Sequence, residues 1–157
     1  MSAICGVLRF DGAAVRNVDL ERQLNAMSRR GPDRRRSFCD GALGLGHALM
    51  RVTDEDSFDE QPLVDHAAGI ALVADLRLDN REELARALAI DAQSLRRLPD
   101  SALLLRAYQA WGEDCVEHLL GDFSFAVWDG PQRRLFCARD HLGVKPFFYA
   151  HIGQSVI

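Results

Sequence analysis

The sequence lacks a long apolar run, a basic leader and an excess of positive charge. No apolar run reaches the roughly 18 residues that predict a membrane-spanning helix, and no basic segment precedes a long apolar stretch at the N-terminus. Lys and Arg total 19 against 23 Asp and Glu, which gives a formal net charge of −4. That balance does not favour nucleic-acid binding. We therefore expect a cytoplasmic protein that binds neither membrane nor nucleic acid.

Cysteine is also scarce, with one residue at each of positions 5, 39, 115 and 137. The four form no CxxC pair, so the spacing predicts no zinc site and no redox motif. Free thiols in a reducing compartment fit this pattern, with two disulfides as the alternative. We expect no metal and no cofactor within this part of the chain.

The residues that are present indicate a folded domain. Of the 157 residues, 48% are apolar and 27% are charged, which is typical of a globular domain with a sizeable core. The chain ends in Ser155-Val156-Ile157, a run typical of the start of a strand. We expect residues 1–157 to form one domain that is truncated at its C-terminus and belongs to a longer protein.

Periodicity in the first half predicts strands around one helix. Residues 3–10 predict a strand that ends at Asp11-Gly12. Asp19 is expected to cap a helix that stops before residues 30–33, where Gly and Pro occur. The other elements expected here are a hairpin of 36–40 with 42–50, a solvated loop that carries the arginine run 34–36, and a loop over 51–61. Anion binding by the arginine run is the alternative to a solvated loop.

The second half predicts helices between strands. A strand over 69–78 leads to a helix capped by Asn80, and a second helix ends at Gly112. The strands expected after it are 123–128, 134–138 and 146–150. Because strands, helices and strands follow one another without regular βαβ winding, we predict an α+β fold of antiparallel sheets with helices packed outside.

Six sequence blocks resemble one family when they are taken together and in order. They are Ile4-x-Gly6-Val7 with Phe10-Asp11-Gly12, Arg30-Gly31-Pro32-Asp33, Leu45-Gly46-His47, Gln61-Pro62-Leu63, the run 120–126 and the run 138–146. They resemble the glutaminase domain of class II glutamine amidotransferases, in the asparagine synthetase family. The resemblance implies a four-layer αββα sandwich, the N-terminal-nucleophile hydrolase fold.

The nucleophile of that family is a cysteine exposed when Met is removed. Keeping Ile4 and Gly6 in register puts Ser2 in its place. A thiol is a strong nucleophile near neutral pH, whereas a serine hydroxyl depends on an adjacent base. The same register makes Cys5 a small apolar residue within a strand rather than a displaced nucleophile.

The resemblance also places the glutamine pocket. Leu49 stands where the family has an arginine for the substrate carboxylate, and Asp75, Leu76 and Arg77 replace its Asn-Gly-Glu. Asp100 alone keeps a family residue, one that binds the substrate amino group. An ionised aspartate cannot donate a hydrogen bond to an oxyanion, and losing one such donor typically costs about 100- to 1000-fold in rate.

The pocket residues differ from those of the family, while the sequence blocks of the scaffold are retained. This pattern suggests that the domain has lost glutaminase activity. The pattern is similar to asparagine-synthetase-like cyclases, such as lasso-peptide macrolactam cyclases and β-lactam synthetase, which let a substrate amine attack an adenylated carboxylate. The resemblance implies an ATP-dependent synthetase domain in the parent chain that uses ATP and Mg, with a precursor peptide or its processing proteins as further partners.

Two other functions stay open. An active glutaminase would use Ser2, with its α-amino group as base, to supply ammonia for asparagine synthesis. A pure interaction module would bind a peptide or carrier. We interpret His47 as structural beside a turn at Gly46, and Lys145 as structural near the junction with the next domain.

Overall fold

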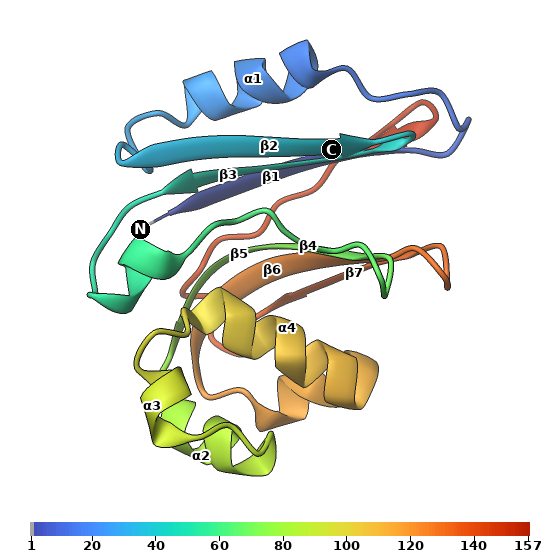
Figure 1. Ribbon diagram of the computed structural model, residues 1–157. Helices are drawn as coiled ribbons and strands as arrows, with labels where there is room; N and C mark the ends of the chain where they lie inside the picture. The colour runs from blue at the N-terminus through green and yellow to red at the C-terminus, as the bar shows by residue number, and fades with distance from the viewer. Residues whose placement is uncertain (1) are drawn as a thin grey trace.

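The computed structural model describes residues 2–157 as four stacked layers (Figure 1). One helix covers a five-stranded sheet, which faces a four-stranded sheet, and the helices of residues 81–118 cover the far side. This confirms the predicted α+β fold, an αββα sandwich of the N-terminal-nucleophile type. The first sheet has the order β2-β3-β1-β9-β8 and consists of β1 (Ala3–Arg9), β2 (Arg34–Asp40), β3 (Leu43–Leu49), β8 (His151–Ile152) and β9 (Ser155–Val156).

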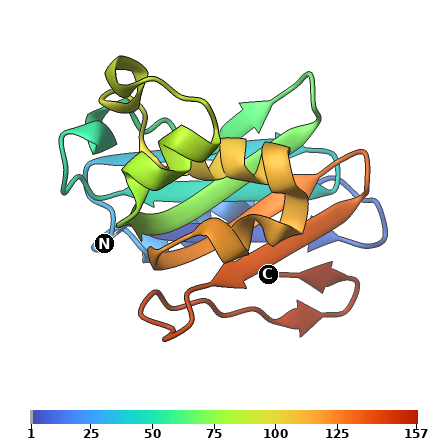
Figure 2. The same ribbon diagram turned by 90° about the horizontal axis from the view of Figure 1, so that it is seen from below.

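The second sheet and its helices complete the sandwich. The sheet has the order β4-β5-β6-β7, from β4 (Leu63–Asp65), β5 (Ile70–Leu78), β6 (Gly121–Asp129) and β7 (Arg134–Arg139). The helices are α1 (Asn17–Ala26), the 3-10 helix η1 (Glu55–Phe58), α2 (Arg81–Ala87), α3 (Ala92–Leu95), α4 (Asp100–Trp111) and the 3-10 helix η2 (Gly112–His118). Figure 2 shows α2 and α4 across the outer face of the second sheet.

Strand alternation divides the interior into two cores. On β5 and β6, Leu72, Phe125 and Val127 face α4 and are fully buried. Val73, on the opposite face of β5, packs with Leu45 of β3 between the two sheets. Burying an apolar side chain of this size contributes about 1.5–3 kcal/mol, so the period-2 pattern fixes which face of each strand meets which layer.

Helix α1 lies close to the first sheet because glycine leaves room for it. A Cβ at Gly46 would lie 2.6 Å from Cys5 Sγ and 3.3 Å from Leu24 of α1. At Gly31, a Cβ would meet the Ala48 carbonyl oxygen at 2.1 Å. A side chain at Gly46 would push α1 away from the sheet, and one at Gly31 would collide with the backbone of β3 at Ala48.

Two predicted element boundaries are wrong. Arg34, Arg35 and Arg36 belong to β2 rather than to a loop, because β2 is an edge strand whose side chains meet solvent while its backbone pairs with β3. Asp19 lies inside α1 and not at its cap. Its carboxylate pairs with Arg16, with Nε 3.0 Å from Oδ2.

The predicted strand over 146–150 is also wrong. This segment connects β7 in one sheet with β8 in the other, so it crosses between the layers instead of pairing along either. The last hairpin starts later, at His151, and turns at Gly153 with φ +59°. Asn80 does precede α2, but its side chain makes no cap bond; it bonds the backbone of His118 and Leu120. None of the helices in residues 2–157 is long and apolar enough to span a membrane.

Candidate functional site

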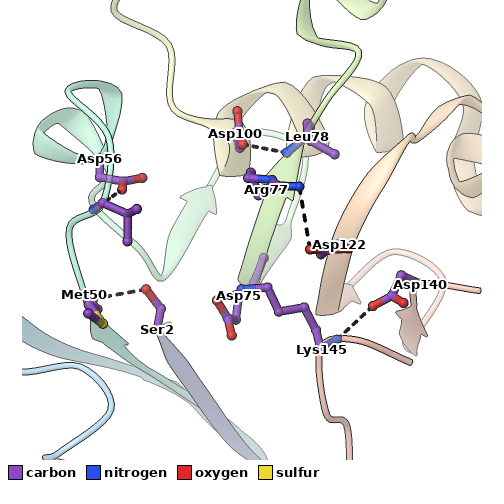
Figure 3. A network of polar contacts seen from close by, with 12 residues as sticks. Ser2, Met50, Asp56, Asp75, Arg77, Leu78, Asp100, Asp122, Asp140 and Lys145 are labelled. Carbon is purple, nitrogen blue, oxygen red and sulfur yellow. Dashed lines mark hydrogen bonds and ion pairs between the residues drawn. The ribbon is translucent and has the colours of Figure 1, made fainter. Parts of the chain in front are cut away.

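The candidate site lies between the two sheets, at the beginning of β1. A cavity of about 750 Å³ opens there, with Ser2, Asp75 and Ser124 among its polar lining residues. Figure 3 shows Ser2 before β1 and Asp75 on β5, with the Lys145 side chain extending toward Asp75 from the segment after β7. The site therefore combines residues from β1, β5, β6 and the link between the sheets.

Ser2 occupies the position where the family's nucleophile is expected. It precedes β1 and falls on the same face as Ile4, which packs between the sheets. Its Oγ accepts a hydrogen bond from the backbone N–H of Met50, at 3.1 Å. A donor directed at Oγ holds the hydroxyl in place but removes no proton, so this contact does not activate serine as a nucleophile.

Asp75 forms a buried ion pair with Lys145. The Lys145 Nζ lies 2.9 Å from Asp75 Oδ1, and the two side chains are only 11% and 8% exposed. Asp75 is on the inward face of β5, directly opposite Ser124 of β6. The carboxylate thus faces the site as an acceptor whose charge is balanced by an ammonium group. Breaking such a buried pair leaves an uncompensated charge.

Asp140 builds the turn that presents Lys145. Its carboxylate accepts the backbone N–H groups of Val144, at 2.8 Å, and of Lys145, at 2.9 Å. Gly143 within the turn adopts φ +65°. Burial acts to raise the pKa of Asp140, but the backbone donors outweigh it and hold the pKa below its usual value. The Asp140 carboxylate therefore holds the backbone of Lys145, and Asp75 holds its ammonium group.

Three other predicted pocket positions lie on β3 and β5. Leu49 is a buried apolar residue at 2% exposure, so it offers no group to a carboxylate. Arg77 lies on the exposed end of β5, with Nε 3.2 Å from Asp79 and Nη2 3.8 Å from Asp122. Leu76 turns to the opposite face of β5 and packs against the core under α4.

Asp100 joins the end of β5 to the helices. Its Oδ2 accepts the backbone N–H of Leu78 at 2.8 Å, and its Oδ1 pairs with Arg81. Arg81 also donates to the carbonyls of Leu95 and Leu98. Burial raises the pKa of Asp100 above its usual value. The Leu78 N–H and the Arg81 charge act in the opposite direction but do not outweigh burial. Both carboxylate oxygens are thus engaged within the protein, which makes Asp100 a connector between β5 and α2.

A buried polar network behind the site was not predicted from the sequence. Gln61 bonds both the N–H and the C=O of Ala74, and its Nε2 lies 2.9 Å from Asp59 Oδ2. Asp59 in turn accepts from Ser101 Oγ at 2.8 Å. The Gln61-Pro62-Leu63 block was the available signal, although the sequence gives no partner for the Gln61 amide.

His47 reaches the same network from β3. Its Nε2 lies 3.4 Å from Gln61 Nε2. Burial lowers the pKa of His47, partly offset by the charges of Asp59 and Asp75. The neutral imidazole packs as part of the interior. The predicted turn at Gly46 is wrong, since Gly46 lies inside β3 opposite Cys5.

Cys5 lies in β1, and its side chain packs beneath α1. It packs against the cluster of Ala3, Leu24 and Ala48. Burial raises the pKa of its thiol to about 12, so the thiolate required for nucleophilic attack is scarce at neutral pH.

Comparison with known proteins identifies relatives of this chain. The family described as "Glutamine amidotransferase domain" matches residues 1–157. The chain is 36% identical over its whole length to "Asparagine synthetase [glutamine-hydrolyzing] 3" of Bacillus subtilis, and 32% identical over 83% of its length to "Amidase chry2" of Gibberella zeae. It spans 26% and 20% of the lengths of these relatives.

A solved structure shares the fold. Glutamine phosphoribosylpyrophosphate (PRPP) amidotransferase from B. subtilis, solved with ADP and GMP, superposes with a TM-score of 0.57 over 98% of this chain and 34% of that one, at 16% identity. At that identity the likeness concerns the fold alone. The family match over the full chain and the asparagine synthetase relative together settle the family. The chain belongs to the class II glutamine amidotransferase domains of the asparagine synthetase family.

Proposed function

We propose that this chain is the glutaminase-like part of an ATP-dependent amide-forming enzyme, and that it has lost glutamine hydrolysis while keeping a scaffold role. The parent enzyme would carry a synthetase domain that uses ATP and Mg. The asparagine synthetase relative, of which this chain spans 26%, supports a longer parent. In this proposal the domain supports the synthetase domain and supplies it with no ammonia.

The Asp75–Lys145 pair is the observation that carries the proposal. Acyl transfer needs neutral or positive donors directed at the developing oxyanion. At the family's oxyanion position this chain presents a carboxylate, which only accepts hydrogen bonds when it is ionised. Asp75 Oδ1 lies 2.9 Å from the Lys145 ammonium, so the carboxylate accepts a hydrogen bond at this position and donates none. A negative oxygen here would repel the negative charge that develops during hydrolysis.

The rest of the pocket supports the same conclusion. A glutamine substrate brings an α-carboxylate and an α-ammonium, and each needs a charged partner in the site. Leu49 provides none, and both oxygens of Asp100 are engaged by Leu78 and Arg81. Arg77, at the position expected to meet the ammonium, carries the same sign of charge. The changes thus remove recognition as well as catalysis.

We further propose that the parent enzyme is a macrolactam cyclase of the lasso-peptide type. The run Ala74-Asp75-Leu76-Arg77-Leu78-Asp79-Asn80-Arg81 resembles that group. Such an enzyme takes its amine from the substrate itself, so an inert glutaminase domain is no disadvantage. A precursor peptide and its processing proteins would then be the partners of the parent chain.

One observation favours the alternative of an active glutaminase. Lys145 places an ammonium group at the site that contains Ser2, and an ammonium group is an oxyanion donor if Asp75 releases it. In that case Ser2, once it becomes the terminal residue, would attack glutamine with its α-amino group as base.

The deciding experiment measures ammonia release from glutamine by the purified parent enzyme. We expect no release above background, and no difference between the wild type and Ser2→Ala. Ammonia formation that Ser2→Ala abolishes would overturn the proposal. Amide formation with ATP should be tested in parallel with ammonia and with a peptide amine, because only the second should support turnover in a cyclase.

A further inference from the structure

Strand β2 is the outer strand of the first sheet. Within residues 2–157 it pairs only with β3, at the end of the sheet opposite β8 and β9. Helix α1 leaves this edge uncovered, because its Leu20 and Leu24 approach Gly44 and Gly46 of β3. Figure 1 shows α1 above the face of the sheet. The seven residues of β2 therefore form a strand with one open side.

The alternation of the backbone determines which groups point to this open side. The Arg9 N–H donates to the carbonyl of Ala42 at 2.9 Å, so Ala42 points toward β1. Because consecutive residues of an antiparallel strand bond to opposite sides, the odd-numbered residues of β3 bond to β2, where their partners are the even-numbered residues. The N–H and C=O groups left on the open side belong to Arg35, Ser37 and Cys39. Such a row of groups is a template for another strand.

The inward face of β2 has more positive charge than its own contacts balance. Arg34 and Arg36 share this face with Phe38, which packs between the sheets. Both arginines approach the same Glu60 carboxylate, with Arg34 Nη1 at 3.9 Å and Arg36 Nη2 at 3.5 Å. Arg34 Nη2 is buried and has no hydrogen-bond partner within the described residues, which is rare in folded proteins. An acceptor for Arg34 is therefore missing on this face.

We propose that β2 pairs antiparallel with β2 of a second copy of this chain, about a two-fold axis at Ser37. In this register Ser37 lies opposite itself, and Arg34 lies opposite Asp40 of the partner subunit. The two first sheets would then form one continuous sheet, in the isologous arrangement that two-fold symmetry requires. The proposal goes beyond the proposed function and does not rest on it.

Charge complementarity selects both the occupant and the register. Asp40 is exposed and lies on the same inward face of β2 as Arg34, so each pair places a carboxylate opposite a guanidinium group. Directly opposed charges of opposite sign stabilise a strand pair. Arg36 would lie opposite the Phe38 ring of the partner subunit, a favourable contact for a guanidinium group. An axis at Arg36 would place that arginine opposite itself, and an axis at Phe38 would place Arg34 opposite Ala42, without a carboxylate.

Exchanging the two charges tests the pairing in the full parent enzyme. A pair of seven-residue strands is small for an interface, so we expect a dissociation constant of about 1–100 μM by sedimentation. Arg34→Glu and Asp40→Arg should each raise it at least about tenfold, because each dimer contains the pair twice. The double variant has opposite charges again and should regain association.

Arg35→Glu is the matched control for the charge exchange. Arg35 lies on the α1 face, where it bonds Asn25 at 2.8 Å, and the proposed register gives it no charged partner. We expect its dissociation constant to stay within about threefold of the wild type. A parent enzyme that is monomeric throughout this range, a dimer that survives both single reversals, or a double variant that stays dissociated would overturn the proposal.

Disulfide trapping tests the register separately. Ser37 and its symmetry mate form a hydrogen-bonded pair with Cα atoms about 5.5 Å apart, within the range that a disulfide bridges. In a Cys39→Ser background, Ser37→Cys should link two chains under mild oxidation. Arg35→Cys in the same background should not, because position 35 lies opposite position 39. Equal linking from both positions, or none from position 37, would overturn the proposed register.

Amide hydrogen exchange distinguishes a second copy from another part of the parent chain. The amides of Arg35, Ser37 and Cys39 should exchange rapidly in dilute parent enzyme and slowly at concentrations where the dimer forms. Slow exchange at every concentration would mean that the parent chain covers this edge itself, and the proposal would fail. None of these measurements uses glutamine, so ammonia release that depends on Ser2 in an intact dimer would refute the proposed function alone.

Discussion

Lys145 and Asp75 are 70 positions apart in the sequence, yet their charged groups meet at 2.9 Å between the two sheets. Neither side chain has much contact with solvent. Each charged group therefore needs the other as its counter-charge. The pair also fixes the segment after β7 to β5, in the cavity that Ser2 lines. This attachment affects both the chemistry of the site and the stability of the fold.

Replacing one partner of this pair should cost more than replacing both. Asp75→Asn leaves a buried ammonium without its counter-charge, and we expect a loss of about 3–5 kcal/mol in the free energy of unfolding. The double variant Asp75→Asn with Lys145→Met removes the charge as well and should recover much of that loss. Urea unfolding of the two single variants and the double variant measures the coupling. Additive losses would show that the pair is not coupled.

Gln61 should be among the least replaceable polar residues of the domain. Gln61→Leu leaves the N–H and C=O of Ala74 and the carboxylate of Asp59 without this partner. Each buried group left unpaired costs about 1–3 kcal/mol, so we expect a marked fall in the urea midpoint. Gln109→Leu is the control, because its amide bonds Asp65 at the surface. A small effect at Gln61 and a large one at Gln109 would contradict this account.

Local patterns predicted most of the elements. Leu20 and Leu24 mark the buried face of α1, and the alternation of Phe123, Phe125 and Val127 gives β6 together with the face that packs against α4. These signals are local, because a helix or strand repeats its burial every few residues. Arg34–Arg36 failed as a prediction because charge alone cannot distinguish a loop from an edge strand.

The site was predictable only in part. The family register placed Ser2, Asp75 and Asp100 in one region, but it gave no partner for Asp75. That partner lies in the link between the sheets, and no spacing rule joins residues so far apart. The same applies to the contacts of Gln61 with Ala74 and Asp59. The resemblance assigned Asp100 to the substrate amino group, but its contacts are with Leu78 and Arg81, and the sequence alone does not reveal them.

Asp140 should control how firmly Lys145 is held. Asp140→Ala removes the acceptor for the N–H groups of Val144 and Lys145, and we expect a loss of about 1–3 kcal/mol. Amide exchange at these two residues should quicken as the turn loosens. Asp79→Ala removes an exposed carboxylate that pairs with Arg77, and it should change stability by less than about 1 kcal/mol. Unchanged exchange at Val144 and Lys145 in Asp140→Ala would argue against this role.

His47 should make the domain less stable in mild acid. Burial lowers its pKa in the folded protein, whereas an unfolded chain has an ordinary histidine pKa of about 6.5. Between those two values the unfolded state binds more protons, so the free energy of unfolding falls as the pH drops below about 6.5. His47→Gln removes the titrating group and should flatten the pH dependence of unfolding in this window. His66→Gln changes an exposed histidine and should leave the slope as in the wild type. Urea unfolding between about pH 5 and 7.5 measures all three slopes, and equal slopes in wild type and His47→Gln would show that another group is responsible.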